Sequence, residues 1–463
     1  MILLPLQTSD CTVQLSHELA PFSPRPTCFD YAAHDEEMLV QNALHYAKAF
    51  FWVRLAPSSA TTPHPEHLFY SHMQLSKNAF RGYMIAVTMG LNYSVADHPQ
   101  RKLHEKMRTR YTGILLNEIR NVIDDLPMDR LDEVIATVLI LSVTSQLAVK
   151  PRAELPGSRF RSPLAEAQLL DFWGQLKFDR AHLNGMRCLV ELAGGLGKMV
   201  SPDVAALVQI ADLINASRTV SAPMFTYHDF FTQQHSQESK QHDSSATLKV
   251  IKTAFLVVIP LTSDFSPLLD AVAASCAATE ALDDYQRAQP TTHAFSSLVG
   301  LRNRAQYLAL STNVIAYGKH DVQLTPGDIA IHDILRLTLL IFNNTVLYPL
   351  PPTSGLASKL AQRLEELLST TQQSCSNIWT SHRLLILWSL VMGYISCLAS
   401  ADDADACRPW FETQCAKLVV AIFGTTPTVD ILETCLSRYL WCETVLSAKF
   451  REFYAILTEE VGG

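Results

Sequence analysis

The stretch CLVELAGGLGKMVSPDVAALVQIADL, residues 188–213, decides whether the chain carries a nucleotide-binding loop or two helices joined by a turn. A phosphate-binding P-loop requires G-x-x-x-x-G-K followed by Ser or Thr, between a strand and a helix. If Gly197 and Lys198 were the final pair, Leu192 would stand in place of the first glycine and Met199 in place of the hydroxyl residue. Both required residues are missing, so the stretch is not expected to bind a nucleotide.

The residues on either side of the glycines favour two helices. Apolar residues before the glycines recur at helical spacing, at Leu183, Met186, Leu189, Val190 and Ala193. The pair Gly194-Gly195 directly after this run is typical of a left-handed C-cap. After it, Ser201-Pro202-Asp203 offers an N-cap serine, a proline at the first helical position and an early acid. The stretch therefore predicts a helix, a glycine cap, a short loop and a second helix.

The helical period recurs from about residue 34 to the end of the chain, for example over 264–288 and 427–457. We expect an all-α fold, an irregular array of roughly 15 helices with no substantial sheet. Residues 1–33, with several prolines and no helical period, are expected to form an extended lead-in. Residues 34–460 are expected to form a single helical domain. Its polar stretch 232–247 is expected to be a mobile loop between two helical halves.

The composition excludes several classes of protein. Hydrophobic residues make up 48% of the chain, charged residues make up 18%, and the net charge is −8. A dedicated nucleic-acid binder would show a basic face or tail, so direct DNA binding is not expected. The ten cysteines form no C-x-x-C pair, which favours a reducing intracellular compartment without disulfides. The apolar stretches 134–149 and 384–401 are interpreted as buried helices, and no membrane is expected to be a partner.

No sequence pattern identifies a catalytic or metal site. His64, His67 and His72 could offer three imidazoles to zinc, but no Cys or carboxylate completes the set at a diagnostic spacing. Three acidic pairs lack the arrangement of a magnesium–diphosphate site, namely residues 124–125, 283–284 and 402–403. We therefore predict no catalytic residue, no metal ligand and no cofactor, and we do not expect an enzyme.

Three separated blocks of the sequence resemble the fungal-specific transcription-factor domain, the regulatory region that usually follows a Zn2Cys6 DNA-binding cluster. In the first block the residues that match the family pattern are His182, Gly185, Gly194, Gly195, Asp212, Pro223 and Phe225. The second block, 331–352, is similar to a late helix that ends in a Pro-Leu-Pro turn, here with Pro349 and Pro351. The third block, 383–411, resembles an apolar helix with the pattern Trp-x-Leu-x-Met-Gly.

The resemblance implies a regulator of RNA polymerase II genes that is located in the nucleus and shuttles, if at all, with the cytoplasm. It implies action through other transcription factors or co-regulators, or through a small-molecule effector, and it is compatible with a homodimer. An alternative from another class is a helical enzyme or accessory protein of fungal secondary metabolism.

The family's DNA-binding cluster of six cysteines has no counterpart in this sequence. Only Cys11 and Cys28 lie upstream of the resemblance, and they do not have its spacing. Three explanations are compatible with this departure. The chain borrows DNA binding from a partner, a zinc cluster precedes it in the full gene, or the fold serves another role.

Overall fold

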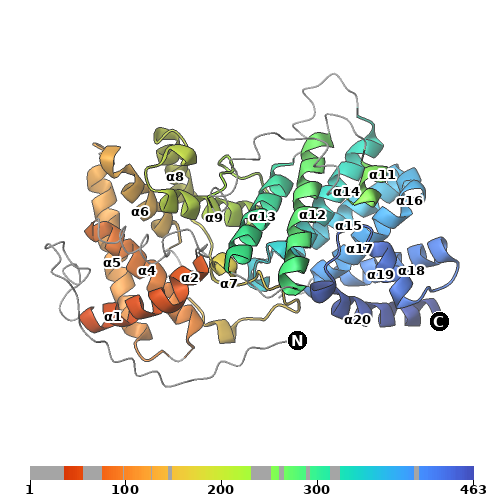
Figure 1. Ribbon diagram of the computed structural model, residues 1–463, viewed down its shortest axis with the longest axis horizontal. Coiled ribbons are helices and arrows are strands. Elements are labelled where there is room, and N and C mark those ends of the chain that lie inside the picture. Colours follow the sequence, from red (N-terminus) through yellow and green to blue (C-terminus); the bar gives the residue numbers. More distant parts are fainter. Residues whose placement is uncertain are drawn as a thin grey trace.

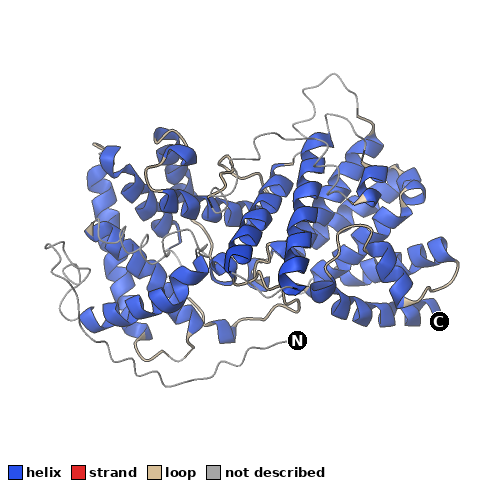
Figure 2. Ribbon diagram, viewed as in Figure 1, coloured by secondary structure: helices blue, strands red, loops and turns tan. Residues whose placement is uncertain are grey.

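In the computed structural model, the residues whose structure is described form an array of helices without a sheet, as Figure 2 shows. It describes residues 36–55, 76–96, 98–126, 128–143, 149–230, 252–259, 265–287, 292–312, 324–400 and 406–462. If contiguous α, π and 3₁₀ turns count as one helix and isolated 3₁₀ turns are not counted, these residues form 17 helices, 15 of them seven residues or longer. The structure is 79% helical, and no strand occurs in the described ranges. The prediction of an all-α fold is confirmed.

The N-terminal part of the array consists of short and long helices joined by 3₁₀ and π turns. Its elements are α1 (Glu37–Tyr46), a π turn (Ala47–Phe51), α2 (Trp52–Leu55), α4 (Lys77–Ser94), α5 (Arg101–Val122), a 3₁₀ turn (Met128–Arg130) and α6 (Leu131–Val143). They are followed by 3₁₀ turns at Arg152–Glu154 and Ala167–Leu169, α7 (Leu170–Trp173), α8 (Arg180–Leu192), a 3₁₀ turn (Leu196–Lys198) and α9 (Pro202–Thr219).

The C-terminal part contains longer helices. Its elements are α11 (Thr253–Val258), α12 (Ser266–Arg287), α13 (Thr292–Ser311), α14 (Pro326–Phe342) with a π turn (Asn343–Leu347), a 3₁₀ turn (Pro352–Ser354), α15 (Leu356–Ser374), α16 (Ser376–Ser381), α17 (Arg383–Leu398), α18 (Arg408–Phe423), α19 (Val429–Leu436) and α20 (Glu443–Gly462). The helix expected over 264–288 is α12. The single helix expected over 427–457 is instead two helices, α19 and α20, because the chain turns between them.

The helices are arranged along the length of the molecule roughly in chain order. Figure 1 shows α1 to α6 at one end, α16 to α20 at the other, and α12 beside α13 between them. Helix α13 also packs against α9 and α14, so it connects the two ends.

Three clusters of buried apolar side chains form the core. The largest includes residues from Phe160 to Val220 and from Phe255 to Leu457. The second joins α1, α2, α4 and α5, and the third joins α6, α8 and α9. The largest cluster thus draws on both sides of the polar stretch 232–247. That stretch and the lead-in 1–33 lie outside the described residues.

The most apolar helices lie inside this core. Every residue of α17 from Leu385 to Leu398 is buried. Among the described residues, one helix, Pro326–Leu347, is long and apolar enough to cross a membrane, and 83% of its apolar window is buried inside the protein. Burial within a helical core is sufficient to explain the composition of both segments.

Candidate functional site

The glycine pair that follows α8 forms a Schellman cap. The Gly195 N–H donates to the Val190 carbonyl at 2.8 Å, and the Gly194 N–H donates to the Glu191 carbonyl at 3.0 Å. Both glycines have positive φ, 85° at Gly194 and 96° at Gly195, a region that residues with a Cβ rarely occupy. The predicted helix cap is therefore confirmed.

Helix α9 begins as expected, with Ser201 as its N-cap residue. Pro202 is its first residue, as predicted, but the Ser201 side chain makes no capping hydrogen bond. Instead, the Ser201 backbone N–H donates to the carboxylate of Asp132 on α6. The prediction of Ser201 as the N-cap residue is confirmed by position, while the hydrogen bond expected from an N-cap side chain does not form.

Asp212 holds the segment after α9 against that helix by hydrogen bonds. Its two carboxylate oxygens accept the backbone N–H groups of Met224 at 3.0 Å and Phe225 at 3.1 Å. Burial raises the pKa of Asp212 to about 6, although the two hydrogen bonds act in the opposite direction. Asp212, Pro223 and Phe225 of the family pattern are thus brought together by one carboxylate.

Gln209, about one turn earlier on α9, also holds this segment by hydrogen bonds. Its amide donates to the His228 carbonyl at 2.8 Å, and its side-chain oxygen accepts the His228 N–H at 2.7 Å. The imidazole of His228 lies against Gly197 in the cap loop. The segment from about Met224 to His228 therefore connects α9 with the end of α8.

The remaining residues of the family pattern lie apart from Asp212. The His182 Nδ1 atom is 3.1 Å from the carboxylate of Asp179, which caps the start of α8. Gly185 is exposed on α8, and a Cβ added there would meet no atom within 4 Å. Pro349 and Pro351 line a separate polar cavity with residues that include Tyr93, Arg152 and Asp171.

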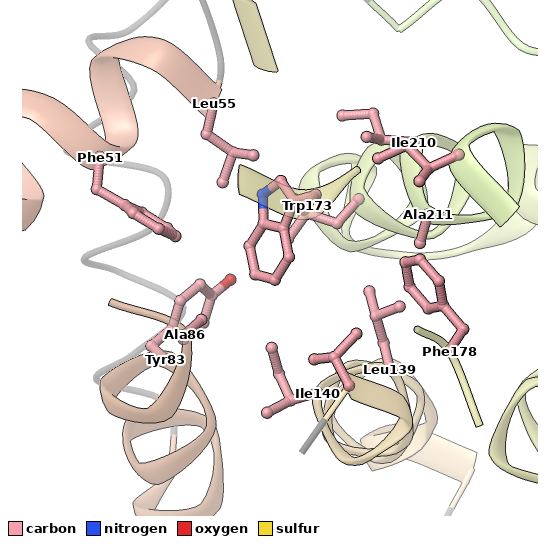
Figure 3. A pocket seen from close by; sticks show the side chains of 13 residues that line it. Phe51, Leu55, Tyr83, Ala86, Leu139, Ile140, Trp173, Phe178, Ile210 and Ala211 are labelled. Carbon is pink, nitrogen blue, oxygen red and sulfur yellow. The ribbon is translucent and has the colours of Figure 1, made fainter. Parts of the chain in front are cut away.

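A narrow apolar cavity lies between the N-terminal helices and α9, and it is the best candidate for a binding site (Figure 3). Its volume is about 50 Å³, below the roughly 300–1,000 Å³ of pre-formed small-molecule sites, so the lining helices would have to move apart to admit a ligand. The lining residues come from α2 and the adjoining π turn, α4, α6, α7, α9 and the loop before α8. They are Phe51, Leu55, Tyr83, Ala86, Leu139, Ile140, Val143, Trp173, Phe178, Leu207, Ile210, Ala211 and Ile214.

Two aromatic side chains supply the polar atoms of the lining. Figure 3 shows the Tyr83 hydroxyl pointing toward the indole of Trp173 across the cavity. Burial raises the pKa of Tyr83 above its ordinary value, so its hydroxyl stays neutral. No carboxylate, lysine, arginine or histidine is among the lining residues. The lining therefore suits an apolar molecule and offers no charged group for acid–base chemistry.

A buried arginine on α13 holds the segment that carries Trp173. The Arg302 guanidinium donates to the Leu164 carbonyl at 2.7 Å, and to the Ala167 carbonyl and the Gln168 side-chain oxygen at 3.0 Å each. Burial lowers the pKa of Arg302 to about 10, so the side chain still carries its charge at neutral pH. Ion–dipole bonds to these three oxygens compensate part of its lost hydration.

The backbone of this segment is bent sharply just before α7. Gln168 and Leu169 have φ of 55° and 56°, in the left-handed region. Beyond Trp173, the guanidinium of Arg218 on α9 donates to the Gly174 carbonyl at 3.1 Å and to the Leu176 carbonyl. The position of Trp173 is therefore set from both sides, by α13 and by α9.

The metal and acidic candidates from the sequence lie only partly among the residues that the structure describes. His64, His67 and His72 and the acidic pair 402–403 lie outside the described residues. Within the described ranges, no group of three His, Cys, Asp or Glu side chains is placed to hold a metal ion.

No protein-family model, curated protein or solved structure matches the chain. Inference about function therefore depends on the geometry of the cavity and on the sequence pattern.

Several residues that build the site carry no recognisable sequence signal. Trp173 and Phe178 follow a proline-rich loop and lie outside any long helical pattern, and Arg302 lies within an ordinary amphipathic helix. Arg302 is followed directly by Asn303 and Arg304, so the local sequence does not distinguish the buried arginine from the exposed one.

Proposed function

We propose that the chain is a helical regulatory domain of the fungal-specific transcription-factor type, and that an apolar small molecule bound in the cavity is its effector. In this proposal it controls RNA polymerase II genes from the nucleus, through other transcription factors or co-regulators. It does not contact DNA itself, and it uses no metal, cofactor or membrane. A homodimer is compatible with the role.

The observation that carries the proposal is the position of the cavity at the meeting point of all three apolar clusters. Ile214 belongs to the largest cluster, Tyr83 to the second and Leu139 to the third, and all three line the cavity. A ligand there would touch every part of the core. Its binding energy could then favour one packing arrangement of the helices over another, which is the requirement for an effector.

The cavity wall also connects to the residues of the family pattern. Ile210 and Ala211 line the cavity from α9, and the next residue, Asp212, holds Met224 and Phe225. A shift of α9 on ligand binding would therefore move the segment that follows it. This link supports a regulatory role, whereas an enzyme would need a general acid, base or metal in contact with the ligand.

The proposal is tested by fusing the full chain to a heterologous DNA-binding domain in a fungal reporter strain. The fusion is expected to change reporter transcription relative to the DNA-binding domain alone. Replacing Ala211 with Phe fills the cavity and is expected to alter that response. Ala181→Phe, on the exposed start of α8, adds the same bulk outside the cavity and should leave the response unchanged.

A binding measurement separates the effector from the transcriptional role. Naphthol, a flat apolar molecule with one hydroxyl, should raise the melting temperature of the wild-type protein and of Ala181→Phe but not of Ala211→Phe. Reporter transcription equal to that of the DNA-binding domain alone, with the fusion present in the nucleus, would contradict the regulatory role. Equal stabilisation of all three proteins by naphthol would contradict the cavity as the effector site.

A further inference from the structure

A second hollow, on the C-terminal part of the molecule, is an open groove formed by three elements. It is lined by α11, by the end of α16 with the start of α17, and by the turn between α19 and α20, which lie near one another in Figure 1. Its volume is about 760 Å³. The groove is far larger than a single inorganic anion requires.

The charged side chains of the groove are all basic. Lys252, Arg383 and Arg438 line it together with His382, whose pKa is lowered by burial, and none of the described lining residues is acidic. The chain as a whole has a net charge of −8, so this groove is a local exception to the acidic surface. A groove lined by one sign of charge attracts ligands of the opposite sign.

Hydrogen bonds of these cations go to neutral acceptors. The Lys252 ammonium donates to the Ser437 carbonyl at 3.0 Å, and the Arg383 guanidinium donates to the Ala421 carbonyl at 3.1 Å. These bonds orient the side chains without neutralising their charge. Lys252 also interacts electrostatically with Asp283, which lies outside the groove lining. The arginines therefore supply most of the uncompensated positive charge.

The groove also has an apolar wall. Val257 on α11 is 77% exposed, and Ala254 and Leu384 lie beside it in the lining. Inorganic phosphate or a nucleotide phosphate would use the cations but gain nothing from this wall. A peptide with acidic and large apolar side chains could use both.

From the charge, the size and the apolar wall we infer that this groove binds an acidic, amphipathic peptide segment of a partner protein. Carboxylates of the segment pair with Arg383 and Arg438, and an apolar side chain packs on Val257. Peptide binding follows from the groove alone. The identification of the partner as a co-regulator rests on the proposed function.

The inference is tested by fluorescence anisotropy with the purified full chain. The probe is a labelled peptide in which Asp and Glu alternate with Leu and Phe. One control peptide has Lys in place of the acids, and another has Ser in place of the apolar residues. The acidic amphipathic peptide should bind, should weaken steeply with salt, and should bind at least about tenfold more tightly than either control.

Substitutions of groove residues test whether the peptide binds in the groove. Arg383→Glu/Arg438→Glu is expected to weaken binding by about tenfold or more, and Val257→Ser by several-fold. Lys102→Glu/Lys106→Glu on α5 makes the same charge change at exposed positions and should bind as the wild type does. Because Arg383 bonds to Ala421, the single variant Arg438→Glu, at an exposed position, gives a second measurement that does not disturb that contact.

The outcomes that would overturn the inference are distinct. Unchanged affinity in both arginine variants, or equal binding of the lysine peptide, would exclude the groove as an acidic-peptide site. Displacement of the peptide by inorganic phosphate at equal concentration would indicate a site for free anions. Peptide binding without any effect in the reporter strain would leave the groove in place and count against the co-regulator identification.

Discussion

The backbone of Gly197 lies directly against the imidazole ring of His228. A Cβ at position 197 would lie 2.6 Å from Cε1 of His228, closer than two carbon atoms can approach. The backbone of His228 is held by two hydrogen bonds to Gln209, so the ring could relieve such a contact only by rotating about its side-chain bonds. The loop that first suggested a nucleotide site is therefore a packing surface for the segment that follows α9.

This contact predicts that Gly197→Ala destabilises the protein by about 1–3 kcal/mol, the usual cost of overpacking a close contact. The free energy of unfolding is measured by urea denaturation. Gly185→Ala is the matched control, because a Cβ there meets no atom within 4 Å and alanine favours a helix interior. That control is expected to be neutral or stabilising, and equal stability of the two variants would contradict the packing contact.

The cap after α8 predicts that Gly195→Val lowers the free energy of unfolding. Gly195 has a φ of 96°, and a β-branched residue in the left-handed region costs about 1–2 kcal/mol or more. Thermal unfolding measures the effect. Gly113→Ala in the middle of α5 is the control, since it has open space around its Cβ and is not among the glycines with positive φ. A melting temperature for Gly195→Val equal to that of the wild type would argue against the cap.

The titration of Asp212 is expected to make the free energy of unfolding depend on pH. Because burial raises its pKa from 3.8 to about 6, the folded state binds the proton more tightly than the unfolded state. This contribution is complete below about pH 4 and is lost as the pH rises through about 6. The free energy of unfolding of the wild type relative to Asp212→Asn should therefore fall between pH 4 and pH 7, by up to about 3 kcal/mol.

Asp179 provides a control of opposite sign for this measurement. It also accepts two backbone N–H groups, but it is exposed, and the hydrogen bond from His182 lowers its pKa. The contribution of ionised Asp179 to the stability of the folded state is present above the ordinary carboxylate pKa. It is lost as the pH falls through the lowered pKa. A wild-type advantage over Asp212→Asn that stayed constant, or rose with pH, would refute the assignment for Asp212.

The hydrogen bonds of Arg302 are expected to link the stability of the core to ligand binding in the cavity. Arg302→Met leaves three acceptors on the segment 164–168 without their donor, and should cost about 3 kcal/mol or more. It should also reduce the stabilisation by naphthol, since this segment positions Trp173. Arg304→Met, two residues away and exposed, should affect neither quantity. Unchanged naphthol binding in a folded Arg302→Met protein would show that the cavity does not depend on this arginine.

The composition predicts that the purified chain alone shows no sequence-specific binding to duplex DNA at physiological salt. Selection from a random duplex pool, followed by electrophoretic mobility assays, measures this. The fusion with a heterologous DNA-binding domain serves as the positive control. Recovery of a specific sequence by the isolated chain would contradict the expectation that DNA contact comes from a partner.

The sequence by itself determined the all-α class and the local structure around the glycine pair. The local structure depends here on interactions within a few residues, namely the helical period, the cap at Gly194-Gly195 and the helix start at Pro202. Such interactions can be predicted without knowing the fold. The same local reasoning failed at 427–457, where two helices form instead of one. At Ser201 it gave the correct N-cap position but not the absence of a side-chain hydrogen bond.

Only the tertiary structure decided where a ligand can bind. The cavity exists because side chains from six different elements meet around Trp173, and the basic groove exists because α11, the start of α17 and the turn at Arg438 converge. Arg302 and Asp212 gain their roles from carbonyl and N–H groups that are distant in sequence or outside their own helix. Such sites depend on long-range packing, which a local pattern of residues does not encode.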